Sequence, residues 1–523
     1  MLNPFNRPTP PEDTVASLNS NGFRRRPRGK RLQTPPQMLV DRAVNPVPKP
    51  PLIGLLAILS IVAGLHSAPA DRSQPLALLS DNPHYFQFRG KPTVLITSGE
   101  HYGAVLNLDF DYIKYLKALA ADGLNLTRTF SGAYAEPYGA FNISSNTLAP
   151  APGRFICPWR RSDVPGYANG GNKFDLSRWD EAYFTRLKDF VARADKRGVV
   201  VEMNLFCPMY DESQWKLSPQ NSLNNINGVG EVARTNVYAL DRNGGLLAVQ
   251  ETMTRKIVTE LNGFENVYYE ICNEPYFGGV TMEWQRRMAD VIVETERTLS
   301  NHHLISQNVA NDKARVQDPH PALSIFNFHY ASPPDTVGMN FGLNKVIGDN
   351  ETGFRGTNDL PYRAEAWSFI LAGGGLFNHL DYSFTAGHED GTYVYGAKQP
   401  GGGNPAFRRQ MKVLKEFINS FDFKEMKPLG PDAMARVEGG ARVYVLAEPG
   451  KAYAIYLAPG DKTAAPHKAV VSLELPPGSY RATWVDPLTG DIERRETVRS
   501  EKGPVVLKSP PYREDVALKL IRK

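Results

Sequence analysis

Cysteine and net charge are both scarce in this sequence of 523 residues. The three cysteines, Cys157, Cys207 and Cys272, allow at most one disulfide and lack the spacing of zinc ligands, so we expect buried free thiols and no metal site. The formal net charge is only +5, and much of the excess comes from basic residues between positions 24 and 31. Because no basic face is visible in the rest of the chain, we expect no nucleic-acid partner.

Long apolar runs are also rare, and the one that stands out occupies residues 52–65. It is too short for a comfortable membrane span but suits the core of a signal peptide, and Ala68-Pro69-Ala70 follows as an A-x-A-like cleavage site. The residues before it are rich in proline and arginine and lack periodicity, as in disordered segments. We therefore predict a disordered basic segment and a signal peptide over residues 1–70. The segment ahead of the apolar core is long for a signal peptide, which makes Met38 an alternative start to Met1.

The mature protein is thus expected to be exported, that is secreted, periplasmic or at the cell surface, without a stable membrane span. An uncleaved signal anchor is the alternative. No cofactor is indicated by any motif, and the oligomeric state is not predicted.

From residue 71 to about residue 430, strand and helix signals alternate. Eight β-rich runs predict strands, at residues 93–97, 124–130, 199–206, 266–272, 304–309, 323–330, 345–351 and 376–382. Helical patterns connect them; one over residues 246–261 stops at Asn262-Gly263, and another is expected to open at residues 175–179. Eight strands with helical connections over about 350 residues predict an α/β fold, a (β/α)₈ TIM barrel over residues 71–430.

After Pro431 the pattern changes to short strands separated by glycine and proline turns. These strands are predicted at residues 443–446, 453–457, 470–475, 480–484, 505–507 and 516–520. Short alternating strands at close spacing are typical of an antiparallel β-sandwich, which we place over residues 431–523.

The stretch Asn266 to Pro275 carries the main candidate for catalysis. Apolar and aromatic residues on both parities indicate a strand covered on both faces, and Glu274 follows where this strand ends. Glu351 ends the strand predicted at 345–351, so both carboxylates are expected at the carboxyl edge of the barrel. Two carboxyl groups that flank one bond are what glycoside hydrolysis requires. Asp349, two residues before Glu351 and of the same strand parity, is the alternative to it.

Several motifs together resemble the clan A glycoside hydrolases, the cellulase-like (β/α)₈ barrels, over about residues 80–425. They are Asn125-x-x-Arg128, Asn273-Glu274-Pro275, His329-Tyr330, Glu351-Thr352-Gly353, and Phe174 to Trp179 with Tyr183-Phe184. The resemblance implies that Glu274 is the general acid/base and Glu351 the nucleophile of a retaining reaction. It further implies that Asn273 binds the sugar 2-hydroxyl and that His329 or Tyr330 orients the nucleophile.

Other polar residues are candidates for supporting roles. Arg128 at a neighbouring strand end would keep Glu351 ionised, because a nearby cation lowers the pKa of a carboxyl group; a structural ion pair is the alternative. Glu100, His101 and Asp381 are candidate substrate-binding residues, as is Glu136 in the long loop after residue 130, although each also suits a structural role in its loop. For His329 the alternative is a histidine whose hydrogen bonds are satisfied in the core.

The sequence departs from the cellulase pattern in two places. Residues 380–384 contain no tryptophan to lie beneath the sugar, and His329 and Tyr330 are adjacent, so at most one is expected to face the site from a regular strand. In the C-terminal part, Gly478 to Gly490 resembles a module found beside cellulase-like barrels that is sometimes labelled a candidate collagen-binding domain. A packing role is the alternative for it.

These observations predict an exported glycoside hydrolase that cleaves β-linked glycosides or polysaccharides by a retaining double displacement. Its partner is a carbohydrate substrate, and no metal or organic cofactor is needed. The alternatives are an inverting glycosidase on the same barrel and a catalytically silent carbohydrate-binding or cell-surface protein.

Export can be tested on the mature protein. N-terminal sequencing should begin near Asp71, and replacing the small residue before the cleavage site, Ala70→Phe, should leave an uncleaved product. A full-length wild-type product in the membrane fraction would instead support the signal anchor.

Overall fold

A computed structural model describes residues 74–523, apart from 430–435, 439–440, 461–465 and 502. The disordered segment, the signal peptide and the domain boundary at residue 431 therefore lie outside the described residues. Within the described part, no helix is long and apolar enough to cross a membrane. All three cysteines are buried free thiols.

The central sheet has eight parallel strands in the order β4-β13-β12-β11-β10-β9-β8-β5. The strands are β4 (Leu95–Gly99), β5 (Leu126–Phe130), β8 (Val200–Phe206), β9 (Val267–Cys272), β10 (Ile305–Asn311), β11 (Leu323–His329), β12 (Val346–Thr352) and β13 (Leu376–Leu380). Every predicted strand of the barrel is present, with ends shifted by a few residues. The arrangement confirms the predicted (β/α)₈ barrel.

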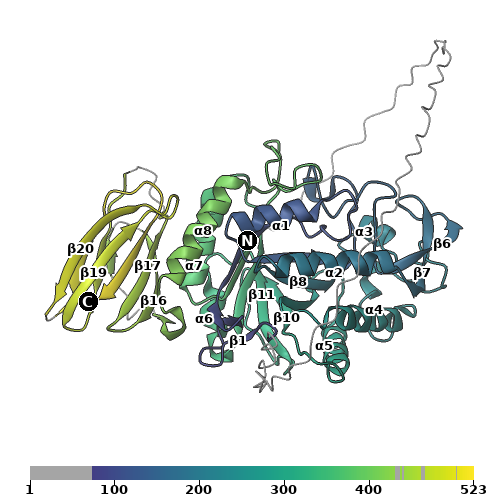
Figure 1. The fold of residues 1–523 in the computed structure, drawn as a ribbon, viewed down its shortest axis with the longest axis horizontal. Coiled ribbons are helices and arrows are strands. Elements are labelled where there is room, and N and C mark those ends of the chain that lie inside the picture. The colour runs from purple at the N-terminus through teal and green to yellow at the C-terminus, as the bar shows by residue number, and fades with distance from the viewer. Residues whose placement is uncertain (1–73, 430–435, 439–440, 461–465, 502) are drawn as a thin grey trace, which may run out of the picture. The chain divides into compact units, whose positions relative to one another are not determined.

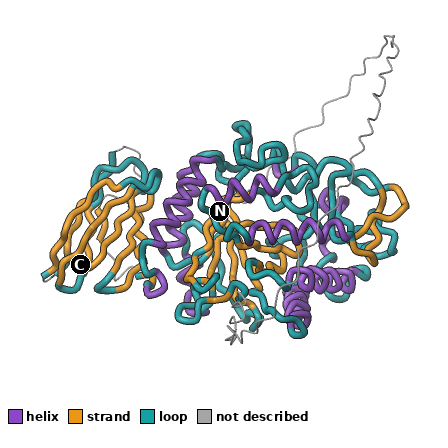
Figure 2. Tube along the Cα trace, viewed as in Figure 1, coloured by secondary structure: helices purple, strands orange, loops and turns teal. Residues whose placement is uncertain are grey.

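Helices surround these strands, as Figures 1 and 2 show. They are α1 (Tyr112–Ala121), α2 (Glu181–Asp195), α3 (Glu212–Leu217), α4 (Leu246–Leu261), α5 (Met282–Glu296), α6 (Asp335–Asn340), α7 (Asp359–Leu371) and α8 (Pro405–Asn419). Short 3₁₀ helices occur at Ala140–Asn142, Arg234–Asn236, Phe341–Leu343 and Phe423–Glu425. Most long helices begin at a side-chain cap, for example Thr281 before α5 and Asn404 before α8.

The prediction that residues 175–179 open a helix is wrong. These residues end strand β7 (Asn172–Trp179), which pairs with β6 (Trp159–Pro165) in a two-stranded sheet. Helix α2 begins only after Asp180, whose side chain accepts hydrogen bonds from the backbone of Ala182 and Tyr183. The cap thus lies five residues beyond the first polar residue of this stretch, Asp175, whose backbone is used by the hairpin.

The two ends of the barrel sheet, β4 and β5, are joined by the side chain of Asn125. Its Oδ1 accepts a hydrogen bond from the backbone N of Ile96 at 2.9 Å, and its Nδ2 donates to the backbone O of Val94 at 2.9 Å. Together with the backbone hydrogen bond from Asn125 N to Ile96 O at 3.4 Å, the amide group of Asn125 therefore links β4 to β5, which gives the Asn125-x-x-Arg128 motif a structural function.

A small antiparallel sheet closes the amino-terminal end of the barrel. It consists of β1 (Ala77–Leu78), β2 (Phe86–Phe88) and β3 (Lys91–Thr93). Phe86 and Phe88 pack in one apolar cluster with the first residues of the barrel strands. This packing leaves the carboxyl end of the strands as the open end of the barrel.

The C-terminal part contains a six-stranded sheet, β14-β16-β17-β22-β19-β20, and a three-stranded sheet, β15-β18-β21. The strands are β14 (Lys427–Pro428), β15 (Arg436–Glu438), β16 (Arg442–Glu448), β17 (Ala452–Ala458), β18 (Val470–Leu473), β19 (Gly478–Val485), β20 (Ile492–Ser500), β21 (Val505–Lys508) and β22 (Val516–Arg522). Antiparallel sheets with their own apolar core confirm the predicted β-sandwich. The sheet includes β14, which precedes Pro431.

The barrel and the sandwich belong to one compact unit, and a buried ion pair joins them. Arg363 of α7 donates from Nε and Nη2 to the two carboxylate oxygens of Asp515, each at 2.9 Å. Tyr456 donates its hydroxyl proton to Asp515 at 2.7 Å and stacks on Trp367 with ring centroids 5.3 Å apart. The contact is therefore both apolar and specifically paired.

Removing one partner of this buried pair should be costly, because the other charge stays buried. We expect Arg363→Met to lower the free energy of unfolding by about 3–5 kcal/mol in urea denaturation. The matched control is Arg287→Met on α5, whose pairs with Glu251 and Glu294 are partly exposed and should contribute about 0–1 kcal/mol. Equal effects of the two substitutions would contradict a structural role for the junction.

Candidate active site

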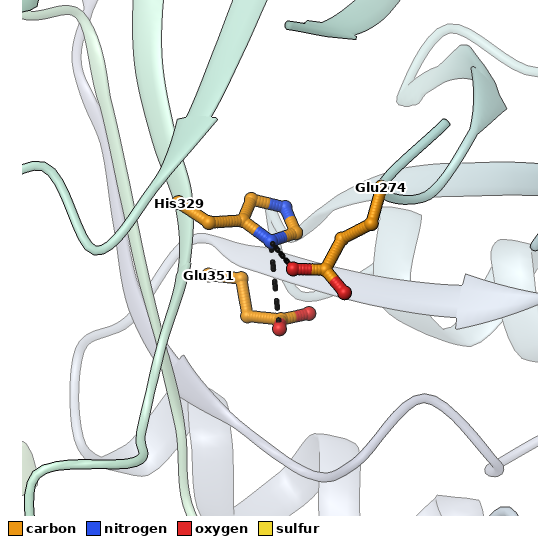
Figure 3. Close-up of side chains that lie close together, drawn as sticks. All are labelled: Glu274, His329 and Glu351. Carbon is orange, nitrogen blue, oxygen red and sulfur yellow. Dashed lines mark hydrogen bonds and ion pairs between the residues drawn. The ribbon is translucent and has the colours of Figure 1, made fainter. Parts of the chain in front are cut away.

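Glu274, His329 and Glu351 meet at the carboxyl end of the barrel. Figure 3 shows the imidazole of His329 next to both carboxylates. Its Nδ1 lies 3.2 Å from Oε1 of Glu274 and 3.5 Å from Oε1 of Glu351. One ligand-type atom from each residue lies within 4.8 Å of the others, a spacing that could also hold a metal ion. Both glutamates are only 6% exposed.

Glu351 is surrounded by hydrogen-bond donors. Its Oε2 accepts from the Tyr102 hydroxyl at 2.9 Å and from Nη1 of Arg128 at 3.2 Å, and its Oε1 accepts from the Tyr330 hydroxyl at 2.7 Å. Donors and a cation favour the charged form of a carboxyl group. The site is therefore built to hold Glu351 as a carboxylate.

Glu274 has a different set of neighbours. The Tyr210 hydroxyl donates to its Oε2 at 2.6 Å, and the Tyr276 hydroxyl lies 3.3 Å from its Oε1. Burial raises the pKa of Glu274, but the hydrogen bonds and charge of His329 and the Tyr210 hydroxyl outweigh it, so that the pKa is lowered. Burial lowers the pKa of His329, and the two glutamates outweigh it, so that the pKa is raised. A proton on the imidazole thus lies between the two carboxylates.

Both His329 and Tyr330 contact the site, contrary to the prediction that at most one would. Strand β11 ends at His329, and Tyr330 adopts a left-handed conformation with φ of 55°. Glu274 and Tyr102 also have positive φ, at 34° and 60°. Such conformations are costly for residues other than glycine and cluster at functional sites. Because they turn the chain out of strand geometry, the alternation rule does not apply to these residues.

Arg128 lies beneath the two glutamates, and its contacts extend into the barrel. Besides Glu351, its Nε contacts Glu202 at 2.8 Å, and its Nη2 contacts Glu270 and, at 2.8 Å, Oδ1 of Asn273. Asn273 also donates to the Tyr210 hydroxyl at 2.9 Å. Both Arg128 and Asn273 are therefore in contact with the residues around the two glutamates.

Sequence reasoning missed Glu202 and Glu270, and also Tyr102 and Tyr210. The two glutamates carried a signal, since each is a lone acid within an otherwise apolar strand, where a charge requires a partner. The two tyrosines lie in loops, and nothing in their sequence context distinguishes them.

Two predicted substrate-binding residues, Glu100 and Asp381, are placed elsewhere. The carboxylate of Glu100 accepts hydrogen bonds from the backbone of Gly103 and Ala104 and from Thr147, which fixes the loop after β4. Asp381 is fully buried, and its oxygens are occupied by donors from Arg408, Ser98 and Ser383. Both residues have structural roles because donors from the protein already occupy their oxygens.

His101 and Glu136 lie closer to the site. Burial lowers the pKa of His101 to about 4, with opposing effects of Glu351 and Arg128, so its ring is neutral. Burial raises the pKa of Glu136 to about 7, against hydrogen bonds from Asn146 and Tyr134, and the charge of Glu351 adds to the rise. Both groups therefore feel the charge of Glu351.

Aromatic residues border the site although the strand-eight tryptophan is missing. Tyr382 follows β13 and packs against Phe354 and His101, with ring centroids 6.2 and 5.8 Å apart. Phe354 in turn packs against Tyr330 at 6.2 Å. Aromatic surface is thus supplied from the loops after β12 and β13.

An eight-stranded barrel with two carboxyl groups at its open end is an arrangement that glycoside hydrolases use. Residues 154–359 match the family described as Cellulase (glycosyl hydrolase family 5). Over these residues the chain is similar to cellulases, in agreement with the resemblance of its motifs. No curated protein matches the sequence.

Solved structures show the same fold over most of the chain. A candidate glycoside hydrolase from Bacteroides vulgatus ATCC 8482 is 13% identical, with 87% of this chain and 84% of that chain covered and a TM-score of 0.59. A glycoside hydrolase family 5 protein from the same organism is 14% identical, with coverages of 86% and 93% and a TM-score of 0.55. At such identities the likeness extends to the fold alone.

The raised pKa of Glu136 predicts a dependence of stability on pH. In the folded protein Glu136 keeps its proton up to about pH 7, whereas the unfolded chain releases it near its ordinary value, about 4.3. The wild type therefore loses stability from this group as pH rises between these values. The difference in Tm between Glu136→Gln and wild type should rise over this range and stay constant above it. A difference that does not change with pH would contradict a buried, protonated Glu136.

Proposed function

We propose that the chain is a retaining β-glycosidase in which Glu351 is the nucleophile and Glu274 the general acid/base. The observation that carries this proposal is the short distance between the two groups, since carboxylate oxygens of Glu274 and Glu351 lie within 4.8 Å of each other. Retaining enzymes have carboxyl groups about 5–5.5 Å apart, whereas inverting enzymes need about 6.5–9.5 Å to admit a water molecule. The spacing therefore favours direct attack over an inverting mechanism.

In the first step, an ionised Glu351 attacks the anomeric carbon of the sugar. Tyr102, Arg128 and Tyr330 all donate to its oxygens, which supports the carboxylate form and fixes its orientation. The bond to the leaving oxygen breaks as the bond to Glu351 forms, giving a glycosyl-enzyme. Water then cleaves this ester with Glu274 as the base.

Glu274 must supply a proton to the leaving oxygen in the first step, although its pKa is lowered when no sugar is bound. The proton is available on His329, whose Nδ1 is 3.2 Å from Oε1 of Glu274. A bound sugar excludes water and disfavours the separated charges of imidazolium and carboxylate, so the proton moves to the glutamate. His329 thus serves as the proton store of the acid, a role other than the orientation of the nucleophile that the resemblance implies.

The structure argues against Asp349 as the nucleophile. Asp349 is fully buried, and burial together with the neighbouring Glu365 raises its pKa well above the usual range. A neutral carboxyl group is a poor nucleophile. The backbone register shifts between Asp349 and Thr352, which explains why the two acids do not share one face as the parity rule predicts.

We further propose that the substrate is a β-linked glycoside or polysaccharide and that the enzyme acts after export. Sugars stack on aromatic rings through their C–H faces. The Tyr276 hydroxyl lies 3.3 Å from Glu274, and Phe354 packs against Tyr330, which donates to Glu351. A panel of aryl β-glycosides and plant polysaccharides tests the sugar and linkage. A catalytically silent binding protein would bind members of this panel without turning them over.

Substitution of each glutamate tests the mechanism. Glu351→Ala should abolish formation of the glycosyl-enzyme, and azide should restore turnover with an inverted product because a small anion fills the space of the nucleophile. Glu274→Ala should slow substrates with poor leaving groups by about 10²–10⁴-fold and activated aryl glycosides much less, because only the former need protonation.

Proton NMR of the first product formed by the wild type decides between retention and inversion. Asp349→Asn serves as the control and should keep the stereochemistry and the response to azide unchanged. An inverted anomer from the wild type, or full activity of Glu351→Ala, would overturn the proposed roles.

A further inference from the structure

Two buried acids, Glu202 and Glu270, lie beneath the catalytic glutamates and have no part in the mechanism described above. Glu202 is on β8 and Glu270 on β9, and both side chains are completely shielded from solvent. Glu202 and Glu270 share a hydrogen-bond donor, because Nδ2 of Asn350 donates to both at 2.8 Å. The two acids therefore form a close pair in the barrel interior, next to the residue that precedes Glu351.

Only one cation among the described residues contacts this pair. Arg128 reaches Glu202 through Nε, Glu270 through Nη2 and Glu351 through Nη1. The remaining contacts of the pair are neutral: the Tyr268 hydroxyl on Glu202, and Asn327 at 2.7 Å and Ser306 at 3.5 Å on Glu270. One guanidinium is thus shared among three carboxyl groups in a dry interior.

Three ionised carboxylates on one buried guanidinium would leave two negative charges without compensation. An uncompensated buried charge is costly, and in such a case a group takes up a proton instead. Three donors and the imidazole of His329 already contact Glu351, whereas the pair beneath shares one cation. The proton therefore belongs to the pair beneath.

We propose that Glu202 and Glu270 share one proton and act as positioning residues for Glu351, because this proton leaves the guanidinium of Arg128 free to stabilise the nucleophile. The inference rests on the proposed role of Glu351. Burial and the charge of Glu270 raise the pKa of Glu202 to about 8, against the effects of Arg128, Tyr268 and Asn350, in agreement with a protonated pair at neutral pH.

The charge of this cluster depends on all the titratable groups that face it from the neighbouring strands and loops. They are Tyr102 after β4, Arg128 on β5, Glu202 on β8, Tyr268, Glu270 and Cys272 on β9, His329 on β11 and Glu351 on β12. The tyrosines and Cys272 have raised pKa values because they are buried, so they stay neutral in the range where the pair would titrate. Arg128 stays charged because the acids around it raise its pKa.

Infrared spectroscopy of the full chain tests the shared proton without reference to activity. At neutral pH the wild type should show the C=O stretch of a protonated carboxyl group that is lost in Glu202→Gln and equally in Glu270→Gln. Each single variant leaves one carboxylate opposite Arg128 with no proton to share, so the double variant should lose no further intensity. In the wild type the same band should fade as pH rises through about 8. This titration needs no variant and remains informative if a substitution prevents folding.

The pH profile of kcat/KM on an activated aryl β-glycoside tests the effect on Glu351, because such a substrate does not need Glu274 as an acid. The single variants keep one negative charge in the pair, as the wild type does, so the acidic limb should not move. The double variant has none, so Arg128 acts on Glu351 alone and the limb should shift to lower pH by about one unit. A merely structural pair would change the maximum rate and leave the limb in place.

Two results would overturn the inference. The first is an infrared spectrum in which neither single variant loses a protonated carboxyl band, which would mean that both acids are ionised. The second is an acidic limb that already moves in a single variant or does not move in the double variant. If the protein were inactive on all β-glycosides, the proposed function would fail while the infrared result would still decide whether the proton is shared.

Discussion

The guanidinium of Arg128 is the interaction on which the barrel interior depends. It joins β5 to β8, β9 and β12 through Glu202, Glu270 and Glu351, and it stacks on the ring of Tyr102 at 4.5 Å. Without it, three acids would face one another in a dry core, where removing one partner of an ion pair costs several kcal/mol. The same contacts that stabilise the barrel therefore also place Glu351, the proposed nucleophile.

Strained backbone conformations position other side chains of the site. Tyr102, Glu274 and Tyr330 all have positive φ at the carboxyl ends of their strands. At each of these residues the positive φ turns the side chain into the site, where regular strand geometry would not point it. Tyr102 and Tyr330 are held there by hydrogen bonds to Glu351, and Glu274 by one from Tyr210. The strain is tolerated because the hydrogen-bond network leaves no relaxed alternative for these residues.

Much of the fold was predictable because local signals agree with the tertiary structure. The helix over residues 246–261 is α4 (Leu246–Leu261), since its apolar periodicity stops at Asn262-Gly263, and the strand before Glu274 is apolar on both faces because both faces are covered. The predictions failed where contacts with neighbouring segments determine the secondary structure. Asp175 was expected to open a helix but lies in a hairpin. The charged strand β20 (Ile492–Ser500) was not predicted because charged residues are rare in strands. β20 lies at the edge of its sheet, where charged residues prevent association with other edges.

For the site, the sequence placed Glu274, His329 and Glu351 at one end of the barrel, since parallel strands end at one edge. The sequence does not indicate which acidic residues of the loops turn toward the site. Glu100 and Asp381 are as polar as Glu351, but their oxygens are taken by other donors. These are the backbone of Gly103 and Ala104 for Glu100 and Arg408 of α8 for Asp381, and such contacts depend on chain geometry that no local pattern records. Glu202 and Glu270 were not predicted as site residues, because strands rich in apolar residues are normally assigned to packing alone.

Charge balance connects the interior pair with the proposed acid. Glu202, Glu270, Glu274 and Glu351 form a continuous set of contacts with the two cations Arg128 and protonated His329. A proton on the interior pair reduces the excess negative charge of this set from two to one. The remaining negative charge is that of Glu351, and the total does not change when the proton of His329 moves to Glu274, because the charges of the imidazolium and of the Glu274 carboxylate disappear together. Because a bound sugar replaces water and a dry site disfavours separated charges, substrate binding itself would shift Glu274 toward its acidic form. The low pKa of Glu274 before binding and its role as an acid afterwards are then two states of one charge balance.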